Sequence, residues 1–117
     1  MSGEIVDVVI EDRDGVVIAQ VTGELDIAGA SSTGDAITQA VPTSARGLVV
    51  DFSSLDFIDS SGVAMLFGLA RHLSGRRQQL RVVAPDGGPV GRVLDIVEFA
   101  RAAPVVDDLE TALGELS

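Results

Sequence analysis

Residues 48–62 read Leu-Val-Val-Asp-Phe-Ser-Ser-Leu-Asp-Phe-Ile-Asp-Ser-Ser-Gly. The segment begins with an apolar run at 48–52, passes through a polar turn, and brings Asp59-Ser60-Ser61-Gly62 to the front of residues 63–73, whose apolar side chains recur at helical spacing. The pattern predicts a strand, a loop and a helix whose first turn carries two hydroxyl groups. Because a helix start has unpaired N–H groups and a partial positive charge, it would favour a phosphate esterified to one of these serines.

Asp and Ser are also ordinary helix N-caps, so the tetrapeptide alone can equally be a plain helix start. The fourteen residues from Val49 to Gly62, however, resemble the signature of the STAS family of anti-sigma factor antagonists. In that family a partner kinase phosphorylates the first Ser of an Asp-Ser-Ser/Thr-Gly motif. The resemblance therefore implies that Ser60 is the phosphorylation site and that Asp59, Ser61 and Gly62 are its neighbours on a partner-binding surface.

A second segment, at the end of the predicted N-terminal hairpin, resembles the same family. Apolar runs at 4–10 and 16–21 flank an Asp-Gly turn and predict a β-hairpin, which ends in Gly23-Glu24-Leu25-Asp26. The resemblance implies that Asp26 lies in a loop near the phosphorylation site, and that Gly23, Glu24 and Asp26 belong to the kinase-facing surface. From the residues alone, Asp26 can instead cap the helix that follows.

The rest of the chain alternates helices and strands. It predicts helices at 30–41, 63–73, 90–97 and 107–116, and strands at 48–52, 80–84 and 104–106. Gly29 and Gly34 weaken the first helix, and Asp107 with Glu110 makes a capping pair for the last. The order β-β-α-β-α-β-α-β-α predicts an α/β fold, in which residues 1–117 form a single STAS-like domain with a mixed sheet and helices packed on it.

The predicted helix at 63–73 has two distinct faces. Val63, Leu66, Leu69, Ala70 and Leu73 fall on one side of a helical wheel and are expected to pack on the sheet. Ala64, Met65, Gly68 and Arg71 fall on the other side. Small residues one turn apart allow another chain to approach closely, and Met adapts its shape to a partner, so we expect these four residues to bind one. The alternative is an ordinary solvated helix face.

The chain departs from the family pattern after the third predicted helix. The family usually has a Gly-containing turn there, whereas this chain reads Ile-Val-Glu-Phe-Ala-Arg at 96–101. Neither the pattern nor the resemblance predicts the conformation of residues 96–103.

Composition limits the class of protein. With 117 residues, 46% of them hydrophobic, the chain suits one globular domain. It has no cysteine, no apolar segment of membrane-spanning length, and no basic start that leads into an apolar run. We therefore expect a cytoplasmic protein with neither a membrane segment nor a signal peptide, and no cofactor.

The net charge of −10 points away from anionic partners, and all eight cations are Arg. Such a chain repels phosphate backbones and lipid headgroups, so direct binding to nucleic acid or to a membrane is disfavoured. A basic or amphipathic protein partner would suit this charge. Alternatively, the acidity only keeps a small domain in solution.

An enzymatic role is disfavoured. The one histidine, His72, lies three helical turns beyond Ser60, and no G-x-S-x-G motif is present. Asp51, Asp56 and Asp59 suggest a metal site or phosphoryl acceptor, but the chain lacks the acidic pair and the Lys of a receiver fold. We expect neither catalysis nor a bound metal.

The resemblance implies a protein whose partner binding is switched by phosphorylation. The unmodified form would capture an anti-sigma factor that is also a serine protein kinase and so release a sigma factor. Phosphorylation at Ser60 would switch this activity off, and a PP2C-type phosphatase would restore it. The alternative is a STAS-type docking subunit of a lipid-transport or stress-signalling assembly.

Overall fold

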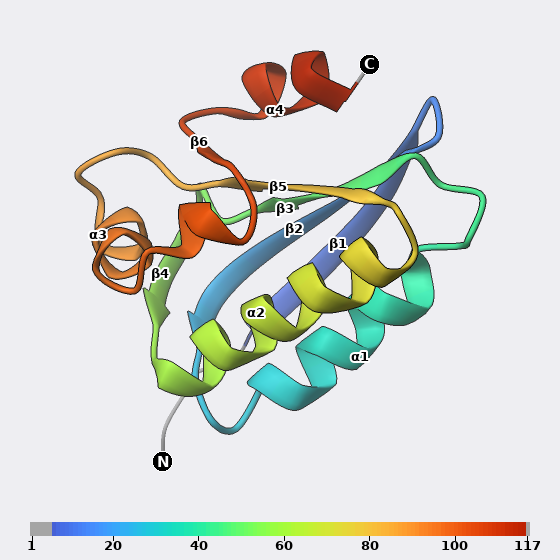
Figure 1. Ribbon diagram of the computed structural model, residues 1–117. Coiled ribbons are helices and arrows are strands. Elements are labelled where there is room, and N and C mark those ends of the chain that lie inside the picture. The colour runs from blue at the N-terminus through green and yellow to red at the C-terminus, as the bar shows by residue number, and fades with distance from the viewer. Residues whose placement is uncertain (1–5, 117) are drawn as a thin grey trace.

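The computed structural model describes residues 6–116, whose first two strands form the predicted hairpin (Figure 1); positions 4 and 5 of the predicted first strand lie outside the described residues. β1 (Val6–Arg13) and β2 (Val16–Leu25) pair antiparallel and are joined by Asp14 and Gly15, whose φ angles are 56° and 86°. Two left-handed residues in a two-residue loop form a type I′ turn, whose twist matches that of the strands. The Asp12 carboxylate accepts the Gly15 N–H at 3.1 Å and closes the turn.

The sheet is mixed and its strands run in the order β1-β2-β3-β5-β6, with β4 also paired to β2. Only β1 is antiparallel to its neighbour; the other pairings are parallel. This confirms the predicted α/β fold class. The remaining elements are α1 (Ala30–Ala40), β3 (Gly47–Asp51), β4 (Leu55–Ile58), α2 (Ser60–Gly75), β5 (Gln79–Val83), α3 (Pro89–Ile96), the 3-10 helix η1 (Phe99–Arg101), β6 (Val105–Val106) and α4 (Leu109–Leu116).

Strand β4 is absent from the predicted element order, which expected a loop there. β3 pairs with residues 16–20 of β2, and β4 continues along the same strand at residues 23–25. The register between β2 and β4 shifts between Gly23 and Glu24, so the two buried residues of β4, Leu55 and Ile58, are three positions apart. A bulge of this kind breaks the two-residue alternation by which a strand is recognised in a sequence.

Helices cover both faces of the sheet (Figure 1): α1 and α2 lie on one face and α4 on the other. The larger core lies under α1 and α2, where Leu48 and Val50 of β3 are buried with Ile37 and Leu66. The smaller core joins Val49 of β3 to α4. All five residues of β3 are buried, as its apolar run predicts. The predicted inner stripe of α2 is confirmed: Val63, Leu66, Leu69, Ala70 and Leu73 are all buried.

The segment after α3 has a defined conformation. Glu98 follows α3 with a φ of 57°, a left-handed geometry that glycine usually provides at the end of a helix. Its N–H donates to the Asp95 carbonyl at 3.1 Å, and its carboxylate pairs with Arg101 at 3.1 Å. Phe99 then turns inward, fully buried, with its ring edge-on to Phe67 at a centroid distance of 4.9 Å.

The cap predicted for the last helix was assigned to the wrong residue. Asp108, not Asp107, caps α4: its carboxylate accepts the Thr111 N–H at 2.8 Å. The Asp107 carboxylate accepts the Asp86 N–H at 3.0 Å and ties the β5–α3 loop to the start of the C-terminal segment. In residues 6–116 no helix is both long enough and apolar enough to cross a membrane.

Candidate functional site

The predicted site residues gather where β2 and β4 end and α2 begins. The Asp59 N–H donates to the Leu25 carbonyl at 3.1 Å, which ties the end of β4 to the end of β2. The Asp59 carboxylate accepts the N–H groups of Ser61 at 2.9 Å and Gly62 at 3.2 Å. Asp59 is thus the N-cap of α2, and the predicted helix start is confirmed.

Gly62 allows the helix to begin this close to the sheet. A Cβ at this position would lie 2.7 Å from Ile58 Cγ1 and 2.9 Å from the Leu25 carbonyl oxygen. Both distances are shorter than van der Waals contact, so a larger residue would push the helix start away from the strand ends. Gly62 is buried, and it positions the start of α2 against the ends of β2 and β4.

The two serines differ in exposure. Ser60 is exposed, whereas Ser61 is half-buried at the edge of a surface hollow. Asp59 already occupies the N–H groups of Ser61 and Gly62, and its carbonyl accepts the N–H of Val63. Within residues 6–116 we find no acceptor for the Ser60 N–H. A phosphate on Ser60 would therefore meet one open N–H group and a neighbouring carboxylate, not the set of open N–H groups that the sequence predicted.

Asp26 shapes the loop between β2 and α1. Its carboxylate accepts the Ala28 N–H at 3.0 Å, and its carbonyl accepts the N–H groups of Gly29 at 3.1 Å and Ala30 at 2.9 Å. The N-cap of α1 is Gly29, which has no side chain to offer, so the alternative role of Asp26 as that cap is wrong. Asp26 follows Leu25 and is half-buried beside the start of α2.

Gly23 and Glu24 lie within β2 and not in the loop. Gly23 has a φ of 95° at the register shift and pairs with Val6 on one side and Leu55 on the other. Glu24 pairs with Phe57 of β4 and is half-buried. Both residues therefore form the strand that carries Asp26 toward Ser60.

A surface hollow of about 440 Å³ is lined in part by Ser61, the residue after Ser60. Its apolar wall is formed by Ile27 from the loop after β2 and by Ala64 and Met65 from α2. Ile27 is 80% exposed, so most of its apolar side chain is open to a partner. The sequence analysis missed Ile27; the available signal was a single branched aliphatic residue between Asp26 and Ala28 in a turn. The full lining is Ile27, Ala30, Ser31, Ser61, Ala64 and Met65.

The predicted outer face of α2 is partly covered by α1. A Cβ on Gly34 of α1 would lie 2.7 Å from Met65 Cγ, so the Met65 side chain packs against the gap that this glycine leaves. Met65 is accordingly half-buried, whereas Ala64 and Arg71 are exposed. At Gly68 the nearest atom to an added Cβ is Arg71 Nη2 at 3.9 Å, so that position is open, as predicted.

The histidine of α2 is remote from Ser60. His72 lies twelve residues farther along α2, which at 1.5 Å per residue is about 18 Å. Its Nε2 is 2.9 Å from Arg76 Nη1. In the described part of the chain, no group of three or more His, Asp or Glu residues is arranged to hold a metal ion. Asp51, one of the carboxylates suggested as a ligand, is buried and accepts the Ser53 N–H at 2.9 Å.

Comparisons with known proteins agree with this geometry. Residues 7–112 match the family model of the STAS domain. The anti-sigma-F factor antagonist RsfA of Mycobacterium tuberculosis is 31% identical over 107 residues, which cover 90% of this chain and 83% of RsfA. The crystal structure of an anti-sigma factor antagonist from Mycobacterium paratuberculosis superimposes with a TM-score of 0.87, at 27% identity, over 98% of this chain and 97% of that one.

The fold is also that of SpoIIAA from Bacillus, an anti-sigma factor antagonist. Its phosphorylated form has a TM-score of 0.69 at 23% identity, over 95% of this chain and all of that one. Its unphosphorylated form has a TM-score of 0.67 at 23% identity, over 93% of this chain and 96% of that one.

Proposed function

This chain belongs to the STAS domain family, and we propose that it is an anti-sigma factor antagonist switched by phosphorylation of Ser60. The observation that carries the proposal is the exposed Ser60, which directly precedes Ser61 on the wall of the hollow that Ile27, Ala64 and Met65 form. Antagonists of this class, RsfA among them, are the relatives that this chain resembles over nine tenths of its length.

In the unmodified form, Ser60 is neutral and no charged residue among those described lines the hollow beside Ser61. A partner can bury an apolar side chain against Ile27 and Met65, because both present apolar area and neither carries charge. The open position at Gly68 lets a partner helix or loop approach the next turn of α2. Arg71 lies one turn farther and is exposed for a partner carboxylate.

Phosphorylation would oppose this contact by charge. A phosphoserine adds about 1.5 to 2 negative charges at neutral pH. It would join the carboxylates of Asp26, Asp56 and Asp59, and Asp59 already takes the first-turn N–H groups that would otherwise compensate it. Burying this charge against a partner shaped for a hydroxyl should cost on the order of 3 kcal/mol, which is a loss of roughly a hundredfold in affinity.

The switch requires no refolding of the domain. Ser60 is exposed and its side chain supports no core contact, so the added phosphate would displace nothing that is packed. We therefore expect changes in backbone NMR shifts to stay near the Asp26 loop and the first turns of α2. Changes spread across the sheet and the distant helices would instead show a conformational mechanism.

We expect two protein partners. The anti-sigma factor would also be the serine kinase that modifies Ser60, and a PP2C-type phosphatase would reverse the modification. The chain itself would supply a docking surface and a phosphate acceptor and no catalytic group. Because such a partner controls transcription, we expect the protein to work in the cytoplasm.

The test is a phosphorylation assay with an anti-sigma factor kinase and ATP, followed by intact-mass measurement. The parent and Ser61→Ala proteins should each gain one phosphate, and Ser60→Ala should gain none. Phosphate mapped to Ser61, with Ser60→Ala modified normally, would refute Ser60 as the acceptor. Binding of the partner to both forms would refute the switch, and constitutive docking without modification would favour the scaffold alternative.

A further inference from the structure

The outer edge of β5 is only half covered by β6. Val82 donates its N–H to the Pro104 carbonyl at 3.1 Å, and Ala84 donates to Val106 at 2.9 Å. Backbone groups point to the same edge of a strand at every second residue, so the N–H and C=O of Leu80 also point outward. β6 contains only Val105 and Val106, and it begins opposite Val82, two residues beyond Leu80.

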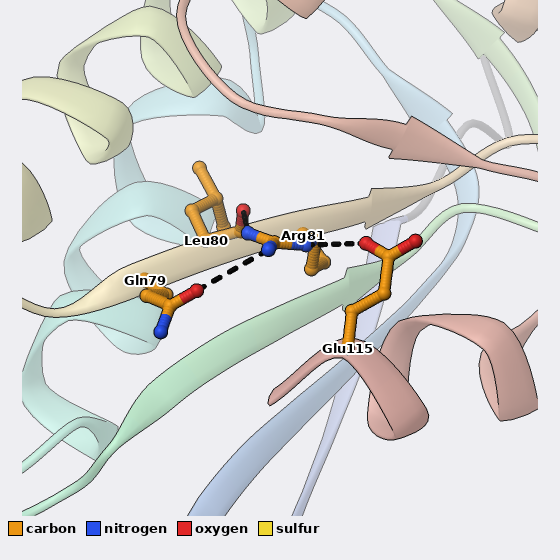
Figure 2. A network of polar contacts seen from close by, with 4 residues as sticks. All are labelled: Gln79, Leu80, Arg81 and Glu115. Carbon is orange, nitrogen blue, oxygen red and sulfur yellow. Dashed lines mark hydrogen bonds and ion pairs between the residues drawn. The ribbon is translucent and has the colours of Figure 1, made fainter. Parts of the chain in front are cut away.

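Of the two outward backbone groups of Leu80, only the carbonyl has a hydrogen-bond partner among residues 6–116. Pro104 has no N–H to offer the Leu80 carbonyl. The Arg81 guanidinium takes that acceptor instead, with Nη1 at 3.0 Å, and is held in place by Glu115 at 2.6 Å and Gln79 at 3.2 Å (Figure 2). For the Leu80 N–H, residues 6–116 provide no acceptor. A strand-edge donor is therefore left open.

This open edge forms one side of a groove. Two adjoining hollows, of about 280 and 450 Å³, share Ala70, Ser74 and Ala102 and run between the second half of α2 and the segment from η1 to β6. Their floor is apolar and includes Leu80 and Phe67. At 1.5 Å per residue, the groove runs along α2 from Phe67, about 10 Å beyond Ser60, to Ser74, about 21 Å beyond it.

The groove is positively charged in a chain whose net charge is −10. Arg71, Arg77 and Arg81 line its two hollows, and no Asp or Glu does. Arg81 is paired to Glu115, but the structure gives Arg71 and Arg77 no carboxylate partner within residues 6–116. By contrast, the hollow at the other end of β5 is lined by Asp86, Asp95 and Asp107 and no cation.

Arg77 is held in place by the backbone. Its φ is 59°, and the Gln78 N–H behind it reaches back to the Leu73 carbonyl at 2.9 Å. This is the Schellman arrangement at a helix C-terminus, which fixes the direction of the chain as it leaves α2. The guanidinium therefore extends from a defined point on the rim of the groove.

We propose that this groove binds an extended, acidic segment of a protein partner, which adds to the open edge of β5. A backbone carbonyl of the segment accepts the Leu80 N–H, its carboxylates pair with Arg77 and Arg71, and its alternate apolar side chains lie on the floor. The groove offers donors and cations together with an apolar floor, and this combination selects an acceptor-rich, acidic strand. The open edge of β5 is distinct from the surface at Ser60, and Arg71 lies at the border between the two.

The probe is a fluorescein-labelled, C-terminally amidated Glu-Val-Glu-Val-Glu-Val-Glu-Val peptide, titrated with the full chain at low ionic strength. We expect saturable binding that weakens as salt is added, because exposed charge pairs are screened. The Leu80 amide signal in a two-dimensional NMR spectrum should shift on titration. A Leu80 amide that does not move would refute strand addition, and equal binding of a Lys-Val peptide would refute charge selection.

A matched pair of variants separates the groove from net charge. Arg77→Gly removes one guanidinium at a left-handed position where glycine is favoured, so the fold is retained. Arg92→Ala removes one exposed guanidinium on α3, away from the groove. Arg77→Gly should weaken the peptide about tenfold, and Arg92→Ala less than about twofold. Equal losses would overturn the proposal, and phosphorylation of Ser60 should be unchanged in both variants.

Discussion

The two ends of α2 differ in how their backbone and charge are satisfied. At the first end, Asp59 caps the helix, Gly62 sits against the strand ends, and negative charge collects beside an apolar hollow. At the far end, no atom of the described residues lies within 4 Å of a Cβ added to Gly75, and the groove is lined by Arg71 and Arg77, for which residues 6–116 provide no carboxylate. One helix thus presents two surfaces of opposite charge, and close approach to the strands requires a glycine at Gly62 but not at Gly75.

The strongest test of this difference compares two glycines. Gly62→Ala should lower the free energy of unfolding by about 2 kcal/mol, because its Cβ would overlap Ile58 and the Leu25 carbonyl. Gly75→Ala should be neutral or stabilise by up to about 1 kcal/mol, since alanine favours helix and the position is open. Urea denaturation monitored by circular dichroism measures both. If the two variants proved equally stable, the tight seating of the helix start would be wrong.

Two isoleucine substitutions test whether the apolar hollow at the start of α2 binds the partner. Ile27→Ala should weaken binding of the anti-sigma factor about tenfold, because a buried aliphatic anchor in an interface is lost. Ile96→Ala on α3 serves as the control, since both side chains are 80% exposed. Neither change should alter stability by more than about 0.5 kcal/mol. Isothermal titration calorimetry measures the affinities, and an equal loss in both variants would show that the hollow at Ile27 is not the binding surface.

The cap at the first end should make a smaller contribution to stability. Asp59→Ala removes the acceptor of two N–H groups and should cost about 1 kcal/mol of unfolding free energy. The matched control is Asp56→Ala, an exposed carboxylate on β4 for which the structure gives no hydrogen bond. Both variants lose one negative charge, so thermal unfolding separates capping from charge. A cost in Asp56→Ala as large as in Asp59→Ala would contradict the capping role.

The smallest expected effect concerns the start of α4, which lies outside both of the surfaces on α2. The Thr111 backbone and side chain donate to Asp108 and lower the pKa of its carboxyl below the usual 3.8. Because the folded-state pKa is the lower one, this stabilisation is present above pH 3.8 and is lost as pH falls through the folded-state value. Asp108→Asn should therefore lose slightly less stability on acidification than Asp35→Asn, an exposed control on α1. If the stability of both variants fell equally with pH, the Asp108 carboxylate would not stabilise α4.

Periodic segments were predictable from the sequence, and positions defined by contacts between segments were not. Helix α2 was predictable from the apolar residues that recur at helical spacing between Val63 and Leu73, and β3 from its continuous apolar run. In both elements the spacing of apolar residues matches the residues that are buried. The register shift between β2 and β4 made β4 unrecognisable as a strand in the sequence. Asp107 and Asp108 are adjacent, so a helix start misplaced by one residue was enough to assign the cap to the wrong aspartate. Placing Ile27 beside Ala64 requires the fold, since thirty-seven positions of sequence separate them.

The hairpin turn at Asp14 and Gly15 also bears on how quickly the chain folds. β1 pairs with β2 across a two-residue loop. The parallel pairings join residues much farther apart in the sequence: Val16 pairs with Gly47, 31 residues away, and Gly47 with Gln79, 32 residues away. Closing the longer loops costs roughly 2 kcal/mol more chain entropy than closing the hairpin. The hairpin can therefore form within microseconds, and the search for the parallel partners β3 and β5 sets the folding rate.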